Sequence, residues 1–231
     1  MRYNELTFQG RNAVLEAFRS GKTIDKLFIL DGCQDGPIKS IVREAKKTDA
    51  IINYVDKERL DRLAGTGHHQ GVVAIGAAYE YAEVDDILAA AKEKGEDPFI
   101  FILDEIEDPH NLGAIIRTAN LAGAHGVIVP KGRAVGLTAT VAKTSAGAIN
   151  YTPVAKVTNI SQTIEELKKQ GLWFVCADMG GETMYNLNLK GPIGLVIGNE
   201  GNGVSRLVKD KCDFIAVSYT HLRAHETLRH L

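Results

Sequence analysis

The sequence predicts an α/β protein whose larger part is a mainly parallel sheet covered by helices. Two observations support this prediction. From Pro98 onward, short apolar runs alternate with helical stretches, which is the order expected of a parallel sheet with helices on both faces. The runs are nearly all apolar, as strands buried on both faces are. They are Phe99–Leu103, Gly126–Val129, Leu172–Ala177 and Ile193–Ile197.

The amino-terminal part, residues 1–78, has a more mixed pattern that predicts a small α/β domain. Its first helical stretch, Asn12–Ser20, is followed by Gly21, a residue that favours the end of a helix. The second, Pro37–Lys47, has proline near its start and a basic outer face. The elements expected here are helices at 12–20, 37–47 and 57–64 and strands at 26–30, 51–55 and 71–75.

Residues 79–97 have few strand formers and are rich in Ala, Glu and Lys, with a helical centre at Val84–Lys94. We interpret this stretch as the linker between the two domains. The larger domain then covers residues 98–217, with helices at Asn111–Ala122 and Ile160–Gln170 and a last strand at Cys212–Val217.

Residues 218–231 do not fit the rest of the chain. His221, His225 and His230, three of the seven histidines, lie close together there. A histidine-rich tract can bind a metal, but no carboxylate or cysteine pattern accompanies it, so we expect no metal site. We interpret this tail as a non-native segment, similar to a translated vector or adapter sequence, and leave it out of the fold.

The composition is that of an ordinary globular protein, with 45% hydrophobic and 24% charged residues. No signal peptide and no apolar stretch of membrane-spanning length is found, so we expect a cytoplasmic protein with no membrane partner. The three cysteines are widely spaced, which fits neither a disulfide framework nor a metal site. The net charge of −2 means that any contact with nucleic acid must come from local basic patches.

The first candidate site is the segment from Leu103 to Ala119, a strand end that runs into a helix. Ligands of α/β sheets gather at the carboxyl ends of the strands. Asp108 followed by proline is a good helix start, and Arg117 is the one charge in an otherwise apolar helical run. For a helix taken alone, Arg117 on a solvent face and Asn111 as a second capping residue is the alternative interpretation.

The second candidate site is the segment from Leu195 to Ser205, an apolar strand followed by glycines around one carboxylate. Glycines at a strand end let the backbone approach a ligand closely. The spacing G-x-x-G-x-G is not that of a dinucleotide-binding fingerprint, and no Lys-Ser/Thr pair of a P-loop follows. A tight turn without ligand remains the alternative for this segment taken alone.

Together these two segments resemble the first two signature motifs of the SpoU family of RNA ribose 2′-O-methyltransferases, which belongs to the SPOUT superfamily. The resemblance extends over residues 4 to about 217 and includes Gly10–Leu15 and His69–Ala74. It implies an L30e-like domain that binds the RNA substrate and a methyltransferase domain with a trefoil knot. It also implies S-adenosyl-L-methionine as cofactor and a homodimer. The subgroup most similar methylates a guanosine of large-subunit (23S) ribosomal RNA, and a tRNA 2′-O-methyltransferase is the alternative.

The resemblance also implies roles for single residues. The catalytic candidates are Asn111, Arg117 and Glu200. The cofactor-binding candidates are Ile197, Gly198, Asn199, Glu200 and Gly201, and Ser145–Ala148 resembles a family segment near the cofactor. The RNA-binding candidates are Arg11, His69, Lys131 and Arg133, beside a basic helix face with Lys39, Arg43, Lys46 and Lys47.

The chain departs from the family at its third motif, which is missing where residues 218–231 stand. In the family this segment threads the knot, contacts the adenine and packs in the dimer interface. We therefore expect weak cofactor binding and an incomplete knot. An RNA-binding module without catalysis is the second hypothesis, and a Rossmann-type oxidoreductase is disfavoured by the glycine spacing.

Overall fold

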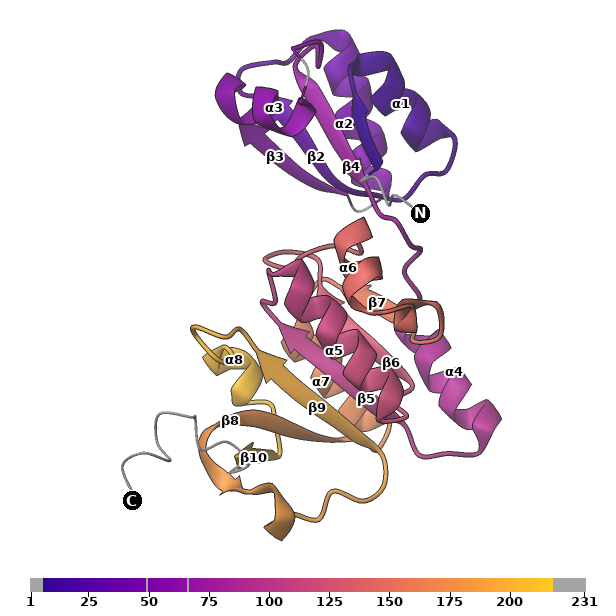
Figure 1. Ribbon diagram of the computed structural model, residues 1–231, viewed down its shortest axis with the longest axis vertical. Helices are drawn as coiled ribbons and strands as arrows, with labels where there is room; N and C mark the ends of the chain where they lie inside the picture. The colour runs from indigo at the N-terminus through magenta and orange to yellow at the C-terminus, as the bar shows by residue number, and fades with distance from the viewer. Residues whose placement is uncertain (1–5, 49, 66, 218–231) are drawn as a thin grey trace. The chain divides into compact units, whose positions relative to one another are not determined.

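The computed structural model describes residues 6–48, 50–65 and 67–217, which form two compact units (Figure 1). The first unit comprises the chain up to Glu80 together with Val135–Thr144, and the second comprises Tyr81–Ala134 and the chain from Ser145 onward. The tail at 218–231, and with it the interpretation of that tail, lies outside the described residues. No helix of the described part is long and apolar enough to cross a membrane.

The first unit is built on a four-stranded sheet of order β1-β4-β2-β3. Strand β4 runs antiparallel to both β1 and β2, whereas β2 and β3 are parallel. The strands are β1 (Leu6–Gln9), β2 (Ile24–Leu30), β3 (Ile51–Val55) and β4 (Val72–Gly76).

Helices cover both faces of this sheet. Successive side chains of β2 point to opposite faces, so β2 contributes to a core on each side. Leu27 points into a core with α1 (Arg11–Arg19) and α2 (Gly36–Lys47), whereas Phe28 points into a core with α3 (Lys57–Ala64). Asp35 caps the start of α2 and Asp56 caps the start of α3. Each side chain accepts a backbone N–H group from the first turn of its helix. The short helix α6 (Ala139–Thr144) also belongs to this unit.

The second unit contains a six-stranded sheet of order β10-β8-β9-β5-β6-β7, in which every neighbouring pair is parallel. The predicted α/β class with a mainly parallel sheet is confirmed. The strands are β5 (Phe99–Asp104), β6 (Gly126–Pro130), β7 (Val154–Val157), β8 (Trp173–Thr183), β9 (Ile193–Gly198) and β10 (Phe214–Val217). Two short 3₁₀ helices, η1 (Ala148–Asn150) and η2 (Met184–Asn186), lie in the connections.

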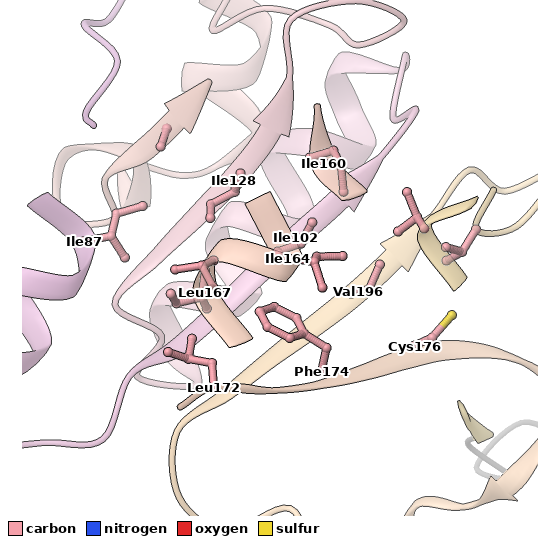
Figure 2. Close-up of a cluster of buried hydrophobic side chains, with 14 residues drawn as sticks. Ile87, Ile102, Ile128, Ile160, Ile164, Leu167, Leu172, Phe174, Cys176 and Val196 are labelled. Atoms are coloured by element: carbon pink, nitrogen blue, oxygen red, sulfur yellow. The ribbon is translucent and has the colours of Figure 1, made fainter. Parts of the chain in front are cut away.

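One face of this sheet is covered by α4 (Val84–Lys94), α7 (Ile160–Lys169) and α8 (Arg206–Lys209). Figure 2 shows the core that they form with the sheet, in which Phe174 and Ile87 are fully buried. The stretch expected to be a linker therefore contains a helix that packs in this core. The ring of Phe174 lies over Gly194, where an added Cβ would come within 2.2 Å of the ring.

The other face is covered only in part. Helix α5 (Pro109–Leu121) lies over β5 and β6 and buries Leu112 and Ile116 (Figure 1). Over β8, β9 and β10 the same face carries a cavity of about 500 Å³, which we call the apolar groove. Its lining residues are Phe99, Val175, Ala177, Met184, Leu189, Gly191, Ile193, Leu195, Ala216 and Val217.

Candidate functional site

The two candidate segments meet at the carboxyl ends of β5 and β9, which are neighbours in the sheet. The register pairs Asp104 of β5 with Gly198 of β9. The chain leaves these strands in opposite directions, after β5 toward β6 and after β9 toward β10. Such a switch point is where open α/β sheets bind ligands, because the loops diverge there and leave a crevice.

The loop after β9 is a tight, self-bonded turn. Asn199 and Gly203 exchange backbone hydrogen bonds of 3.0 and 2.8 Å, and the side-chain Oδ1 of Asn199 accepts the N–H of Gly201 at 2.8 Å. A Cβ on Gly198 would lie 2.2 Å from the backbone of Gly203, so only glycine fits there. The turn displays Glu200 at its exposed tip.

Two hydrogen bonds join this loop to the end of β5. The side-chain Nδ2 of Asn199 donates to the carbonyl of Glu105 at 3.0 Å. The carboxylate of Asp104 accepts the backbone N–H of Ser205 at 2.7 Å, and Asp104 is only 5% exposed. The sequence did not single out Asp104, since a lone acidic residue at the end of a predicted strand carries no pattern.

The turn after β5 is strained and charged. Glu105 has a φ of 59° and Arg133, in the loop after β6, has a φ of 52°, a region that residues other than glycine rarely adopt. Their side chains form an ion pair of 2.6 Å. Both line a polar cavity of about 300 Å³, which also includes Asp104 and Ser205.

Helix α5 carries the two catalytic candidates of the first motif. Asp108 caps it through a 3.0 Å hydrogen bond from the N–H of His110, as predicted. Asn111 lies in the first turn, close to the carboxyl ends of the strands, and Arg117 is exposed. They are six positions apart, so they lie about 9 Å apart along the helix axis and about 120° apart around it.

Within the described residues, no hydrogen bond or ion pair joins Asn111, Arg117 and Glu200 to one another. In this structure, Glu200 and Asn111 therefore do not hold the Arg117 guanidinium. Arg117 is left with its five N–H donors free of protein partners in the described part of the chain.

The segment Ser145–Ala148 lies at the end of α6. Ser145 is fully buried, and Ala146 and Gly147 both have a positive φ, of 50° and 86°. This sharp turn carries backbone amides that are fixed in direction.

Of the RNA-binding candidates in the first unit, Arg11 is surface-accessible and His69 is not. Arg11 donates through Nε to the carbonyl of Gln70 at 3.1 Å and pairs with Asp35. His69 is 5% exposed, and its ring is bonded to Asp61 and to the N–H of Gly71. A buried ring cannot stack on a base, so the structure gives His69 a part in holding the loop that carries Gln70.

Two ionisable pairs in the second unit have shifted pKa values. A hydrogen bond from Lys209 lowers the pKa of Asp178 and raises that of Lys209, in an ion pair of 2.7 Å. The thiol of Cys212 has its pKa raised far above the ordinary value, first by a hydrogen bond with Cys176 and then by burial. Among the described residues, no cluster of three or more His, Cys, Asp or Glu could hold a metal ion.

A glycine loop at the switch point of a parallel sheet is typical of α/β proteins that bind a ligand at this place. The family model of the SpoU rRNA Methylase family matches residues 98–220, and that for RNA 2′-O ribose methyltransferase substrate binding matches residues 9–82. The chain belongs to the SpoU rRNA Methylase family. It is an RNA methyltransferase of the TrmH/SpoU type.

Curated relatives agree with this assignment. YacO of Bacillus subtilis, assigned to the TrmH family of tRNA/rRNA methyltransferases, is 52% identical over 207 residues, which cover 89% of this chain and 83% of that protein. A relative of the same family from Staphylococcus haemolyticus is 48% identical over 211 residues, covering 91% and 84%.

Solved structures share the fold. An AdoMet-bound rRNA methyltransferase from Sinorhizobium meliloti superposes with a TM-score of 0.55 at 22% identity, covering 97% of this chain and 88% of that chain. The SpoU methyltransferase AviRb from Streptomyces viridochromogenes, in complex with AdoMet, gives 0.55 at 21% identity, covering 95% and 83%. At these identities the likeness is one of fold.

Proposed function

We propose that this protein transfers the methyl group of S-adenosyl-L-methionine to a ribose 2′-hydroxyl of RNA, and that its target is a guanosine of 23S ribosomal RNA. The observation that supports this most directly is the joining of the two motif segments at the switch point, where Asn199 and Asp104 link the glycine loop to β5. Family membership and the AdoMet complexes of the structural neighbours support the choice of cofactor.

The donor set of the loop fits this cofactor. S-adenosylmethionine carries no phosphate, and the loop lacks the Lys-Ser/Thr pair that a phosphate-binding loop needs. Ile197, Gly198, Asn199, Glu200 and Gly201 would hold it through backbone groups, one apolar side chain and the carboxylate of Glu200. When bound, the cofactor supplies an activated methyl group on a sulfonium, and a carboxylate near this positive charge is favourable.

The protein's own task is to position the ribose hydroxyl. Positioning of two reactants can lower a barrier by about 7–11 kcal/mol. We assign to Arg117 the orientation of the 2′-hydroxyl and the adjacent phosphate, because its exposed guanidinium is a planar fork of donors. Guanidinium groups are poor general bases, so orientation is its main role. Asn111 would supply an amide at the start of the same helix.

Basic side chains on each unit would hold the RNA backbone. Arg11 on the first unit and Lys131 and Arg133 on the second are the candidates, and phosphate contacts of this kind make binding salt-dependent. Arg133 is 78% exposed while paired with Glu105, so a phosphate can compete for it. His69 would contribute only by holding its loop.

The test of this function is methyl transfer from labelled S-adenosylmethionine to 23S ribosomal RNA fragments and to tRNA. Arg117→Ala should reduce transfer by at least roughly a hundredfold, as loss of a key positioning group does, with unchanged cofactor affinity. Arg206→Ala is the control, because Arg206 is also an exposed arginine, and within the described residues its ion pair is with Asp210. Retained turnover in Arg117→Ala would remove Arg117 from the site, and transfer to tRNA alone would reassign the substrate.

A second candidate function is RNA binding without catalysis, which the separate substrate-binding match at residues 9–82 favours. Calorimetric titration with S-adenosylmethionine separates the two, since a pure RNA binder takes up no cofactor.

For the assembly we propose a homodimer. The apolar groove supports it, because packing a second copy against this apolar lining would remove it from water. Light scattering during size-exclusion chromatography measures the mass directly, and a monomer at micromolar concentration would contradict the dimer.

A further inference from the structure

The glycine loop after β9 must be held in one conformation if it is to bind a cofactor through its backbone. Glycine loses more conformational freedom on ordering than any other residue, so a segment with three glycines between 198 and 203 is costly to fix. Bonds from outside the loop therefore decide whether it is ordered before the ligand arrives.

Those bonds come from β5. Asn199 anchors the start of the loop on the carbonyl of Glu105, and Asp104 anchors its end by accepting the N–H of Ser205 at 2.7 Å. The first bond is between neutral groups, whereas the second has a carboxylate as acceptor. A hydrogen bond to a charged group is shorter and roughly twice as strong as a neutral one.

Burial increases the free-energy cost of losing the hydrogen bond that Asp104 makes. Its side chain is 5% exposed and borders the polar cavity of about 300 Å³. Without it, the N–H of Ser205 would lose its protein acceptor in a half-buried position, which is costly for a backbone donor. The loop would then relax toward conformations in which this amide reaches water.

We propose that Asp104 is a positioning residue for cofactor binding: its carboxylate fixes the carboxyl end of the loop and thereby the backbone of Gly198–Gly201. This inference rests on the proposed function. Asp104 acts through the loop and does not itself touch the cofactor.

The test compares Asp104→Ala, which removes the acceptor, with Asp104→Asn, whose amide oxygen can still accept the Ser205 N–H. The matched control is Asp213→Ala at the opposite edge of the sheet. Asp213 also accepts a backbone N–H, that of Phe174 at 2.9 Å, but no part of the glycine loop. Three quantities are measured on the full chain: hydrogen exchange of the peptide covering 198–205, the dissociation constant of S-adenosylmethionine, and the melting temperature.

Asp104→Ala should speed exchange in 198–205 and weaken cofactor binding about tenfold or more, as the loss of a charged hydrogen bond predicts. Asp104→Asn should stay within about threefold of the wild type, since it keeps the acceptor. Asp213→Ala should lower the melting temperature without changing exchange in the loop or the dissociation constant. If Asp104→Ala does not fold, Ser205→Pro removes the same bond from the donor side, at a φ of −59° that proline adopts.

Equal cofactor affinity of Asp104→Ala and the wild type would overturn the positioning role and leave the proposed function intact. An equal loss in Asp213→Ala would also overturn it, because the effect would then be one of general stability. If the wild type takes up no S-adenosylmethionine, the proposed function fails and the positioning role fails with it.

Discussion

The contact between Phe174 and Gly194 gives a prediction whose size follows from the structure. Phe174 is fully buried on β8, and its ring covers Gly194 of β9 so closely that an added Cβ would lie 2.2 Å from Cε1 and 2.5 Å from Cδ1. These distances are far below van der Waals contact, and the ring has no space to move in a close-packed core. Gly194→Ala should therefore force the ring or the strand to shift.

Overpacking of this kind costs about 1–3 kcal/mol of the free energy of unfolding. In a domain of this size that is a fall of roughly 2–10 °C in melting temperature. Phe174→Leu alone should cost about 1 kcal/mol through the cavity that it leaves. Because the three atoms nearest to the added Cβ all belong to the ring, the double variant should be more stable than the sum of the single losses, by about 1 kcal/mol.

Urea unfolding followed by tryptophan fluorescence is a suitable assay, since the one tryptophan, Trp173, is next to Phe174 and reports on this unit. Gly132→Ala is the control: no atom lies within 4 Å of its added Cβ, so stability should change by less than about 0.5 kcal/mol. The reasoning would be refuted if Gly194→Ala were as stable as Gly132→Ala, or if the losses of the double variant were additive.

Two further predictions concern ionisable groups. His69→Ala should lower the stability of the first unit by about 1–3 kcal/mol, because the N–H of Gly71 loses its buried acceptor. The control is His68→Ala, at an exposed neighbour, which should change stability little. Equal unfolding curves for the two variants would contradict this prediction. The lowered pKa of Asp178 means that its pairing with Lys209 stabilises the fold above the ordinary aspartate pKa and that this stabilisation is lost as the pH falls through the lowered value. Asp178→Asn should therefore lower stability at neutral pH and flatten its fall in acid, and unchanged acid unfolding would contradict the pairing.

The elements with strong local patterns could be predicted from the sequence. The strand at 51–55 and the helices at 57–64 and 84–94 have the bounds that were expected, because apolar spacing and capping residues mark both ends. Strands β1 and β7 were not predicted. Each has four residues, too few for an alternating pattern to stand out.

Strand β8 shows what local pattern cannot predict. It was expected to end at Ala177, but it continues to Thr183 through polar residues and two glycines. The extension exists because β10 pairs with it after a shift of register between Ile215 and Ala216. The carboxyl end of β8 therefore depends on pairing with a strand more than thirty residues away in the sequence. The residues of the segment itself do not predict where it ends.

At the candidate site, the residue types were predictable and their contacts were not. The glycine spacing pointed to the loop. The hydrogen bonds that Asn199 makes within the loop and that Asp104 makes to its end depend on the pairing of β5 with β9. His69 illustrates the opposite error, since a histidine in a glycine-rich loop suggests a surface contact and this one is buried. Domain bounds, knot and individual site roles remain predictions.

The apolar groove has a practical consequence for work with this protein. Environment-sensitive dyes such as anilinonaphthalene sulfonate fluoresce on exposed apolar surface, and the face over β8, β9 and β10 offers such a surface in a monomer, whereas a homodimer that buries the groove would not. A dye-based thermal-shift scan of a monomer should therefore start from a high baseline and obscure the transition, and a scan of the dimer should start from a low one. Label-free detection, through the ultraviolet emission of Trp173, avoids this dye background. In a separate titration with the dye, a ligand or partner that covers the groove should lower the dye fluorescence by displacing it.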